Sequence, residues 1–405
     1  RMRDLGMSPV LPMFAGHVPT AIKTHFPNSS ITIAPTWNRF DGQYRPWVLE
    51  ATDSLFINIG KRFLQLQESV FGANDIDQIF NADIYNEERP PSSSPAYLKA
   101  AAQAVYNGMI AGVSDGVWLM QGWLFYNDQT FWKEEQIQAY LSGVPDDKMI
   151  ILDLYTEVSP VWSRTKEYFG KPWIWCMLLN FGGRPFMGGN IDTIQTKPYE
   201  DLKSTSHMVG IGITMEAIGN NYIMYEAMLE AHWREKAPDQ DQWLKEFIAR
   251  RYGDAAVGLT GINDAWFNIR QYLYRTSNPR STIELIPQLS SSLQAIIERW
   301  LPPDYDALNR VLTNGPTQLW DAWKAMVSDD VAKVLSSQET YIHDVVDLGR
   351  EVLSQKFLVL QKELTDAYIA NNITLVTTYG TNIVIMIEKM DDLLATDKFS
   401  LLGTW

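Results

Sequence analysis

The sequence predicts an α/β fold, an incomplete (β/α)8 barrel of the TIM type followed by an all-α helical domain. Short apolar runs alternate with helical stretches over residues 1–237, which is typical of a parallel sheet covered by helices. Polar residues stand directly after several of these runs, as they do at the C-terminal face of a barrel. From residue 238 to residue 405 the apolar pattern becomes helical throughout, so a second domain is expected there.

Composition limits the possible functions. The chain has 405 residues, 46% of them hydrophobic, which predicts a substantial core. Its net charge of −14 disfavours nucleic acid and anionic lipid as partners. No stretch reaches 18 consecutive apolar residues, so no membrane span is expected. The single cysteine, Cys176, excludes a zinc or iron–sulfur site built on several cysteines.

Six strands are expected in the first domain. The last four are nearly continuous apolar runs, as in strands buried on both faces. Six strands are two fewer than a complete barrel has, so we expect the first strands to be missing. The predicted strands cover residues 7–14, 78–85, 117–121, 149–154, 173–179 and 208–215.

Helices are expected between the strands. One is indicated by the spacing of Phe56, Ile59, Phe63 and Val70 and ends at Gly72. In the next, Ser94 is the expected N-cap and Pro95 the first helical residue. The apolar face of this second helix consists of Leu98, Ala101, Val105 and Met109.

Other candidate sites are not supported by the sequence around them. The sequence GVSDG at residues 112–116 matches a serine nucleophile elbow, but a helix precedes it and a strand follows, which is the reverse of what that motif needs. It is interpreted as a turn. The five histidines show no metal-ligand spacing, so neither a metal nor a cofactor is expected. His17, just past the first strand, either lines a site or caps a turn.

Glu87 and Glu216 are the candidate catalytic pair. Each follows an apolar strand, so both are expected at the mouth of the barrel, 216 − 87 = 129 residues apart in sequence. Glycoside hydrolysis requires two such carboxyl groups, one to protonate the leaving oxygen and one to act as nucleophile or base. A carboxylate at a strand end can also cap the following helix, and this alternative stays open.

Aromatic and amide side chains accompany these acids at other strand ends. Trp37, Trp123 and Trp175 could pack against the apolar face of a sugar, and Asn86 and Asn180 could bind its hydroxyl groups. Other tryptophans are expected in the core, by their position within a strand or at helical spacing: Trp118, Trp266, Trp320 and Trp323.

The sequence NEERPPSS at residues 86–93 resembles the α-N-acetylglucosaminidases of glycoside hydrolase family 89, the lysosomal enzymes of heparan sulfate breakdown. The likeness covers the barrel densely and the helical part thinly. It extends to LGMSPVLP at 5–12, AGHVP at 15–19, LMQGWLF at 119–125, WCMLLNFGG at 175–183, MVG at 208–210, Met215-Glu216, and ARRYG at 249–253.

This resemblance implies a retaining double displacement that releases terminal, non-reducing α-linked N-acetylglucosamine. Glu87 would be the acid/base and Glu216 the nucleophile, while Trp37, Asn86, Trp123 and Trp175 would fall on sugar-pocket positions. It also implies that the chain is a fragment of a longer enzyme, with the first barrel strands and the end of the helical domain outside it. Expressed alone, this fragment is expected to be unstable and nearly inactive.

Two other functions stay open: another glycosidase on the same barrel, possibly inverting, and a non-catalytic carbohydrate-binding remnant. The expected partner is a carbohydrate with terminal α-N-acetylglucosamine, and the sequence leaves the oligomeric state open. Two glycosylation sequons, at Asn28 and Asn372, agree weakly with a lysosomal or secreted protein.

Overall fold

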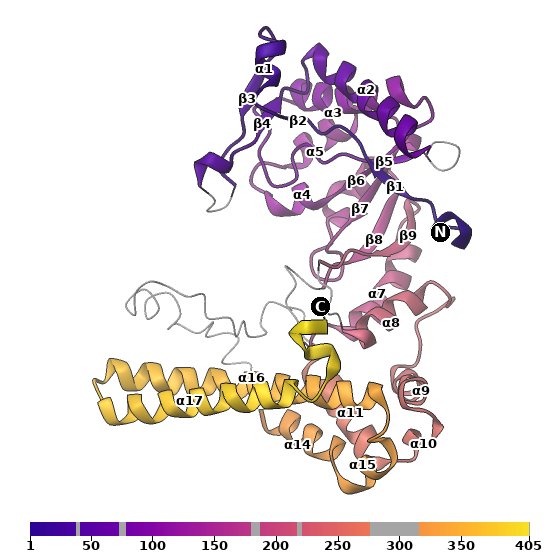
Figure 1. Ribbon diagram of the computed structural model, residues 1–405. Coiled ribbons are helices and arrows are strands. Elements are labelled where there is room, and N and C mark those ends of the chain that lie inside the picture. Colours follow the sequence, from indigo (N-terminus) through magenta and orange to yellow (C-terminus); the bar gives the residue numbers. More distant parts are fainter. Residues whose placement is uncertain (38–40, 73–77, 180–186, 217–220, 276–315, 405) are drawn as a thin grey trace. The chain divides into compact units, whose positions relative to one another are not determined.

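The computed structural model describes residues 1–37, 41–72, 78–179, 187–216, 221–275 and 316–404 (Figure 1). The chain divides into two compact units. The first contains Arg1–Leu178 and Glu200–Thr214, and the second contains Leu179–Tyr199 and Met215–Trp405. The domain boundary predicted between residues 237 and 238 stays a prediction.

The first unit is built on a parallel sheet of six strands, which confirms the predicted strands and their order along the chain. Each strand pairs in parallel with the next, in the order β1-β5-β6-β7-β8-β9. With helices crossing between the strands, the sheet forms an incomplete (β/α) barrel. Its strands are β1 (Val10–Pro12), β5 (Ile79–Asn81), β6 (Val117–Gln121), β7 (Met149–Asp153), β8 (Trp173–Met177) and β9 (Met208–Ile213).

Burial alternates along β6. On β6, Trp118 and Met120 are buried, whereas the alternate residues Val117 and Leu119 are half-buried. The Trp118 indole packs edge-on against Tyr140 of α5, with ring centres 6.2 Å apart. The core position predicted for Trp118 is therefore confirmed.

Several helices connect the strands of this unit. The helices that precede β9 are α1 (Ile22–His25), α2 (Ser54–Phe71), α3 (Pro95–Gly112), α4 (Trp123–Asn127), α5 (Glu134–Leu141), α6 (Lys166–Gly170) and α7 (Ile191–Ser204). Short 3-10 turns accompany them at η1 (Arg3–Leu5), η2 (Gly42–Tyr44), η3 (Asp146–Lys148) and η4 (Trp162–Thr165).

The helices α2 and α3 confirm two predictions and correct a third. The predicted apolar face of α3 is fully buried, and the chain leaves α2 through Gly72 in a left-handed conformation with φ 57°. However, Phe63 and Val70 of α2 are exposed, and the buried residues are Phe56, Gly60 and Leu64. The reason is that Gly60 lies against Gly108 of α3, so the helices approach along a different face.

A small antiparallel sheet follows the first barrel strand, in a region where no strand was predicted from the sequence. Its strands β2 (His17–Val18), β4 (Trp47–Leu49) and β3 (Ile31–Ile33) pair in that order. Strands of two or three residues give almost no periodic signal, which explains why the sequence did not reveal them. This sheet matters for the site because Trp37 lies on the chain between β3 and β4.

The short element α6, between η4 and β8, is a left-handed turn rather than a right-handed helix. Lys166, Glu167, Tyr168 and Phe169 have φ angles of 50°, 56°, 53° and 54°. Four consecutive L-residues in this conformation are costly, at roughly 1–2 kcal/mol each. The turn buries the Tyr168 ring completely, and the Glu167 carboxylate accepts a hydrogen bond from His207 Nδ1 at 2.6 Å.

The second unit is predominantly helical, and its longest helices, α16 and α17, lie side by side (Figure 1). The helices after β9 are α8 (Tyr222–Ala231), α9 (Gln240–Tyr252), α10 (Asp254–Val257), α11 (Thr260–Tyr272), α14 (Pro316–Met326), α15 (Asp329–Leu335), α16 (Glu339–Ile369) and α17 (Ile373–Leu394). The 3-10 turns η6 (Lys398–Ser400) and η7 (Leu402–Thr404) follow. Trp266 is buried as predicted, but Trp320 is 44% exposed, so its predicted core position is wrong.

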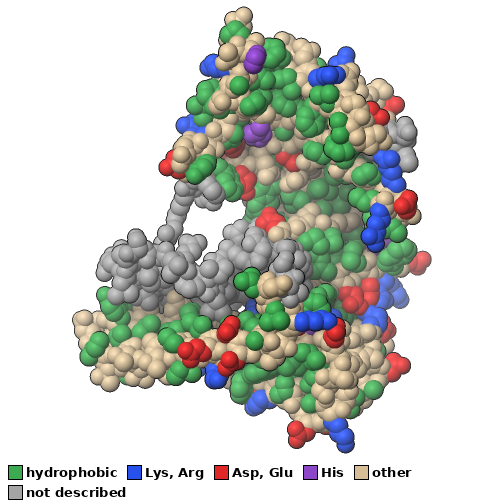
Figure 2. Space-filling view, in the orientation of Figure 1, with side chains coloured by type: hydrophobic (Ala, Val, Ile, Leu, Met, Phe, Trp, Pro, Cys, Tyr) green, Lys and Arg blue, Asp and Glu red, His purple; other side chains and the backbone are tan. Residues whose placement is uncertain are grey.

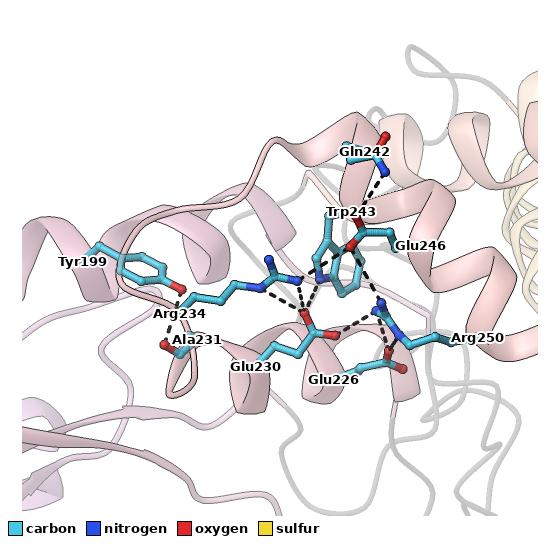
Figure 3. Close-up of polar contacts among 9 residues, drawn as sticks. All are labelled: Tyr199, Glu226, Glu230, Ala231, Arg234, Gln242, Trp243, Glu246 and Arg250. Atoms are coloured by element: carbon cyan, nitrogen blue, oxygen red, sulfur yellow. Dashed lines mark hydrogen bonds and ion pairs between the residues drawn. The ribbon is translucent and has the colours of Figure 1, made fainter.

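Ion pairs join α8 to α9 in this unit (Figure 3). Glu230 accepts hydrogen bonds from Arg234 Nη2 at 2.7 Å and from the Trp243 indole at 2.8 Å. Arg250 of α9 reaches both Glu226 and Glu230 at 2.8 Å. Residues 226–250 are thus held together by shared carboxylates, a structural role that needs no ligand.

Acidic and basic side chains are interspersed over the described part of the face shown in Figure 2. None of the described helices is long and apolar enough to cross a membrane.

Candidate active site

The loop after β5 carries the candidate acid Glu87, and the half-buried carboxylate of Asp83 fixes the start of this loop. Asp83 accepts a hydrogen bond from Asn81 Nδ2 at 2.9 Å and another from the backbone N–H of Gln121 at 3.1 Å. Burial raises the pKa of Asp83 to about 6, although both hydrogen bonds oppose this shift. The loop is therefore tied to the C-terminal end of β6.

The Glu87 side chain is exposed and receives two indole N–H groups. Trp37 Nε1 donates to Glu87 Oε2 at 2.5 Å, and Trp123 Nε1 donates to Glu87 Oε1 at 2.9 Å. Three of the residues singled out from the sequence thus meet in one place. The tryptophans come from different elements, Trp37 from the β3–β4 connection and Trp123 from the first position of α4.

Trp123 reaches this position because Gly122 brings the chain close to β7. The Gly122 N–H donates to the Leu152 carbonyl oxygen at 2.8 Å, and a Cβ at Gly122 would lie only 2.9 Å from that oxygen. Beyond Trp123, ring contacts continue to Tyr126 at 4.9 Å and from Tyr126 to Tyr155 at 5.5 Å. An aromatic row therefore runs from Glu87 to the loop after β7.

The two residues after Glu87 are also charged. Arg89 donates to Thr130 Oγ1 at 2.7 Å and pairs with Asp128, whose pKa it holds below the usual range. Burial raises the pKa of the half-buried Glu88, while the nearby charges of His17 and Arg45 lower it. His17 lies at the start of β2, so the small sheet brings it close to the predicted site.

Asn86 has a polar atom available for a ligand. Its Oδ1 is buried, and no hydrogen-bond partner for it exists among the described residues. A buried acceptor without a donor is unfavourable, and a substrate hydroxyl group could supply that donor.

Trp175 occupies a different environment. Its ring is fully buried, and its Nε1 donates to Asp201 Oδ2 in the last turns of α7, at 2.9 Å. This geometry fits packing better than sugar contact, and the substrate-binding role predicted for Trp175 stays a prediction. Asn180 lies outside the described residues.

Glu216 is exposed and follows the end of β9 by three residues. The preceding strand end is fixed, because the Thr214 N–H donates to the Met177 carbonyl oxygen at 3.0 Å. Glu87 belongs to the first unit and Glu216 to the second. Their pairing stays a prediction.

The sequence interpretation missed two further acids near strand ends, the half-buried Asp83 and the buried Asp153. Asp153 ends β7, and its Oδ2 accepts the N–H groups of Val161 at 3.0 Å and Trp162 at 2.9 Å. Burial raises the pKa of Asp153 to about 7. Asp153 ends a strongly apolar run, which is the signal used for Glu87, whereas Asp83 lies within the range predicted for its strand.

The matches to known protein families and to a curated relative agree with one another. Residues 1–235 match the family model described as alpha-N-acetylglucosaminidase (NAGLU) tim-barrel domain, and residues 243–405 match the NAGLU C-terminal domain. The human protein named alpha-N-acetylglucosaminidase is 34% identical over 415 residues, covering 100% of this chain and 52% of the relative. The chain thus spans about half the length of this relative.

Solved structures show the same fold. A family 89 glycoside hydrolase from Clostridium perfringens, in complex with 2-acetamido-1,2-dideoxynojirmycin, aligns with a TM-score of 0.79 at 24% identity. The alignment covers 97% of this chain and 42% of that one. A variant of the Clostridium perfringens protein, in complex with its substrate GlcNAc-alpha-1,4-galactose, aligns with a TM-score of 0.78 at 23% identity, over 96% and 42% of the two chains.

Proposed function

The chain belongs to the alpha-N-acetylglucosaminidase family, and from this premise we propose that the protein is a retaining glycosidase that removes terminal, non-reducing α-linked N-acetylglucosamine. The observation that carries the proposal is the position of Glu87. Its carboxylate lies beyond a barrel strand and is held by two indole N–H groups. An exposed acid fixed in this way can meet a ligand.

In the proposed reaction, Glu87 is the general acid. Its carboxyl proton passes to the glycosidic oxygen while the bond from that oxygen to the anomeric carbon breaks. Glu216 attacks the anomeric carbon from the opposite side and forms a covalent glycosyl-enzyme. Glu87, now a carboxylate, then takes a proton from water, and the resulting hydroxide displaces Glu216 with a second inversion. This route needs carboxyl groups about 5–5.5 Å apart.

The sugar contacts proposed from the sequence fit this scheme to different degrees. Trp37 and Trp123 border Glu87, and the Asn86 Oδ1 atom could accept a hydrogen bond from a sugar hydroxyl group. Trp175 would contact the sugar only if its buried ring became accessible. No residue in the scheme requires a cofactor.

The relatives support the proposed substrate class. The human relative is named for this activity, and the Clostridium perfringens protein binds GlcNAc-alpha-1,4-galactose. We propose a glycan with the same terminal α-linked sugar for this protein, with heparan sulfate fragments as the first substrates to test and a lysosomal or secreted location.

The test uses the full-length protein and an aryl α-N-acetylglucosaminide. Replacing Glu216 with Ala should abolish turnover, and azide should restore it by forming the inverted β-glycosyl azide. Replacing Glu87 with Ala should slow hydrolysis by about 10²–10⁴-fold. Glu135, an exposed acid on α5, provides the matched control, and Glu135→Ala should keep full activity.

Proton NMR of the first-formed sugar decides the stereochemistry. Release of the α-anomer supports retention, and release of the β-anomer would contradict it in favour of an inverting glycosidase. Unchanged turnover in both the Glu87 and Glu216 variants would end the catalytic assignment. Retained binding together with no hydrolysis by the unmodified protein would identify a carbohydrate-binding remnant.

A further inference from the structure

The contacts of Glu87 give Trp37 and Trp123 a role beyond that of sugar platforms. We propose that these tryptophans are positioning residues whose indole N–H groups orient the Glu87 carboxyl group and stabilise the charge it acquires on giving up its proton. The inference rests on the proposed acid/base role of Glu87. It assigns to each ring a chemical function that depends on a single N–H bond.

The two indole donors bind different oxygens of the Glu87 carboxyl group. One indole N–H meets each carboxylate oxygen, Trp37 at Oε2 and Trp123 at Oε1. A tryptophan N–H donates and never accepts, so in both contacts the Glu87 carboxyl oxygen is the acceptor. Two donors on two oxygens also restrict rotation of the carboxyl group, because turning it would break both contacts.

The charge of Glu87 changes during the proposed reaction. In the first step the neutral carboxyl group loses its proton to the leaving oxygen and becomes an anion. Hydrogen bonds to an ionised acceptor are about twice as strong as those between neutral groups, so both indole contacts strengthen as this charge develops. Donors placed where charge appears lower the barrier of that step.

The second step should respond differently. There Glu87 begins as a carboxylate and accepts a proton from water, so its negative charge decreases. The same two donors then stabilise the starting state of the step more than its transition state. Removal of an N–H group should therefore slow formation of the glycosyl-enzyme without slowing its hydrolysis.

The surrounding structure holds both rings where this role requires them. Gly122 fixes the start of α4 against β7, and Tyr126 packs against the Trp123 ring at 4.9 Å. Trp37 lies on the connection between β3 and β4, whose ends are set by sheet pairing. Trp37 keeps 47% of its surface exposed, so its ring face can also meet a sugar while its N–H stays on Glu87.

The two roles of each ring can be separated by variants that keep the ring but remove its N–H group. A sugar platform needs the ring face, whereas the proposed role needs only the N–H. Site-specific replacement of Trp37 or Trp123 by 3-benzothienylalanine keeps the bicyclic ring and replaces N–H with sulfur. Trp37→Phe and Trp123→Phe serve as second, genetically simpler variants.

The measurement compares substrates that differ in their need for an acid. With a weakly acidic leaving group, such as a sugar or alkyl alcohol, each N–H deletion should lower kcat/KM by about 10–100-fold. With 2,4-dinitrophenol as leaving group, which departs without protonation, the loss should stay below about threefold, and KM should change little. Trp233, 87% exposed on the second unit, is the control, and Trp233→Phe should change neither rate.

The outcomes distinguish failure of the positioning role from failure of the proposed acid/base role of Glu87. If Glu87→Ala shows the leaving-group dependence and the indole variants do not, the positioning role is wrong while the acid/base role stands. If the rate loss of Glu87→Ala does not depend on the leaving group, the proposed acid/base role of Glu87 is wrong. An equal loss on both substrates in the benzothienyl variants would overturn the inference, because it would indicate a binding or packing role.

A second readout does not depend on turnover. In protein labelled with ¹⁵N at the tryptophan indoles, Glu87→Gln should shift the Nε1–H resonances assigned to Trp37 and Trp123. The Trp233 resonance should stay in place. Unmoved Trp37 and Trp123 signals would contradict the contacts on which the inference stands.

Discussion

The guanidinium group of Arg251 on α9 pairs with the buried carboxylate of Asp344 on α16, with 2.5 Å between Nη2 and Oδ1. The Tyr252 hydroxyl group donates to the same carboxylate, which is only 10% exposed. This pair therefore links two helices of the second unit across 93 residues of sequence.

Breaking this pair should be costly. Arg251→Met leaves a buried carboxylate without its counter-charge, and we expect the free energy of unfolding to fall by about 3–5 kcal/mol. Denaturant unfolding measures this change. Lys389→Met, which removes an ion pair whose partners are both about 70% exposed, is the control and should cost less than about 1 kcal/mol. Equal effects would show that burial does not govern the Arg251 pair.

Two glycines on α3 should respond oppositely to the same substitution. A Cβ at Gly108 would lie 3.7 Å from the Ile57 Cα atom, an ordinary contact, so Gly108→Ala should stabilise the helix by up to about 1 kcal/mol. A Cβ at Gly112 would lie 2.9 Å from the Leu64 Cβ atom, so Gly112→Ala should cost about 1–3 kcal/mol. Thermal unfolding of both variants tests the approach of α2 to α3, and shifts of the same sign would contradict it.

Asp153 makes stability depend on pH. Its pKa of about 7 in the folded protein lies above that of an unfolded aspartate, so between pH about 4 and about 7 only the folded state holds this proton. Raising the pH through this window should therefore lower the free energy of unfolding by about 1.4 kcal/mol per unit from this group, with no further loss above it.

Asp153→Asn isolates this contribution. The amide cannot ionise, and its oxygen can still accept from Val161 and Trp162, so the variant should lose less stability between pH 4 and 7 than the unmodified protein. Asp115→Asn, at an exposed turn, is the control and should leave the slope unchanged. Parallel pH profiles for Asp153→Asn and the parent would mean that Asp153 is ionised throughout.

Substitution of Trp175 tests whether this residue belongs to the protein core or to the sugar-binding pocket. Because its ring is buried and its N–H bonds Asp201, Trp175→Phe should lower the free energy of unfolding by about 2–4 kcal/mol while leaving KM for an aryl glycoside nearly unchanged. Unfolding and steady-state kinetics on the same preparation measure both. A large rise in KM with unchanged stability would instead restore the sugar contact predicted from the sequence.

Much of the first unit could be predicted from the sequence because its strands are strongly marked. The runs at β6 to β9 are continuously apolar, and parallel pairing of successive strands follows from the helices between them. The prediction for Glu87 used the same reasoning, although β5 ends at Asn81, so a loop of several residues separates the strand from this acid. These inferences need only local pattern and topology.

The contacts of Glu87 could not be predicted in this way. Trp37 reaches the acid only because strands of two and three residues, at β2, β3 and β4, fold into a sheet. The aligned direction of two indole N–H groups depends on side-chain rotamers, which composition and spacing do not encode. The packing of α2 also escaped prediction, because the close approach of Gly60 to Gly108 of α3 depends on how the two helices meet and not on apolar spacing.

The left-handed turn at residues 166–169 reverses the usual ranking of amino acids. At an ordinary helical position alanine is favoured over glycine by about 1 kcal/mol. At φ near +50° the order reverses, because glycine has no Cβ and so avoids the steric strain that other residues incur there. In a library that replaces every residue in turn, glycine and then asparagine should therefore outrank alanine at Lys166, whose exposed ion pair contributes little. Tyr168 should tolerate neither, because its buried ring anchors the turn. Such an inverted profile beside an invariant aromatic would identify this turn in any longer form of the protein.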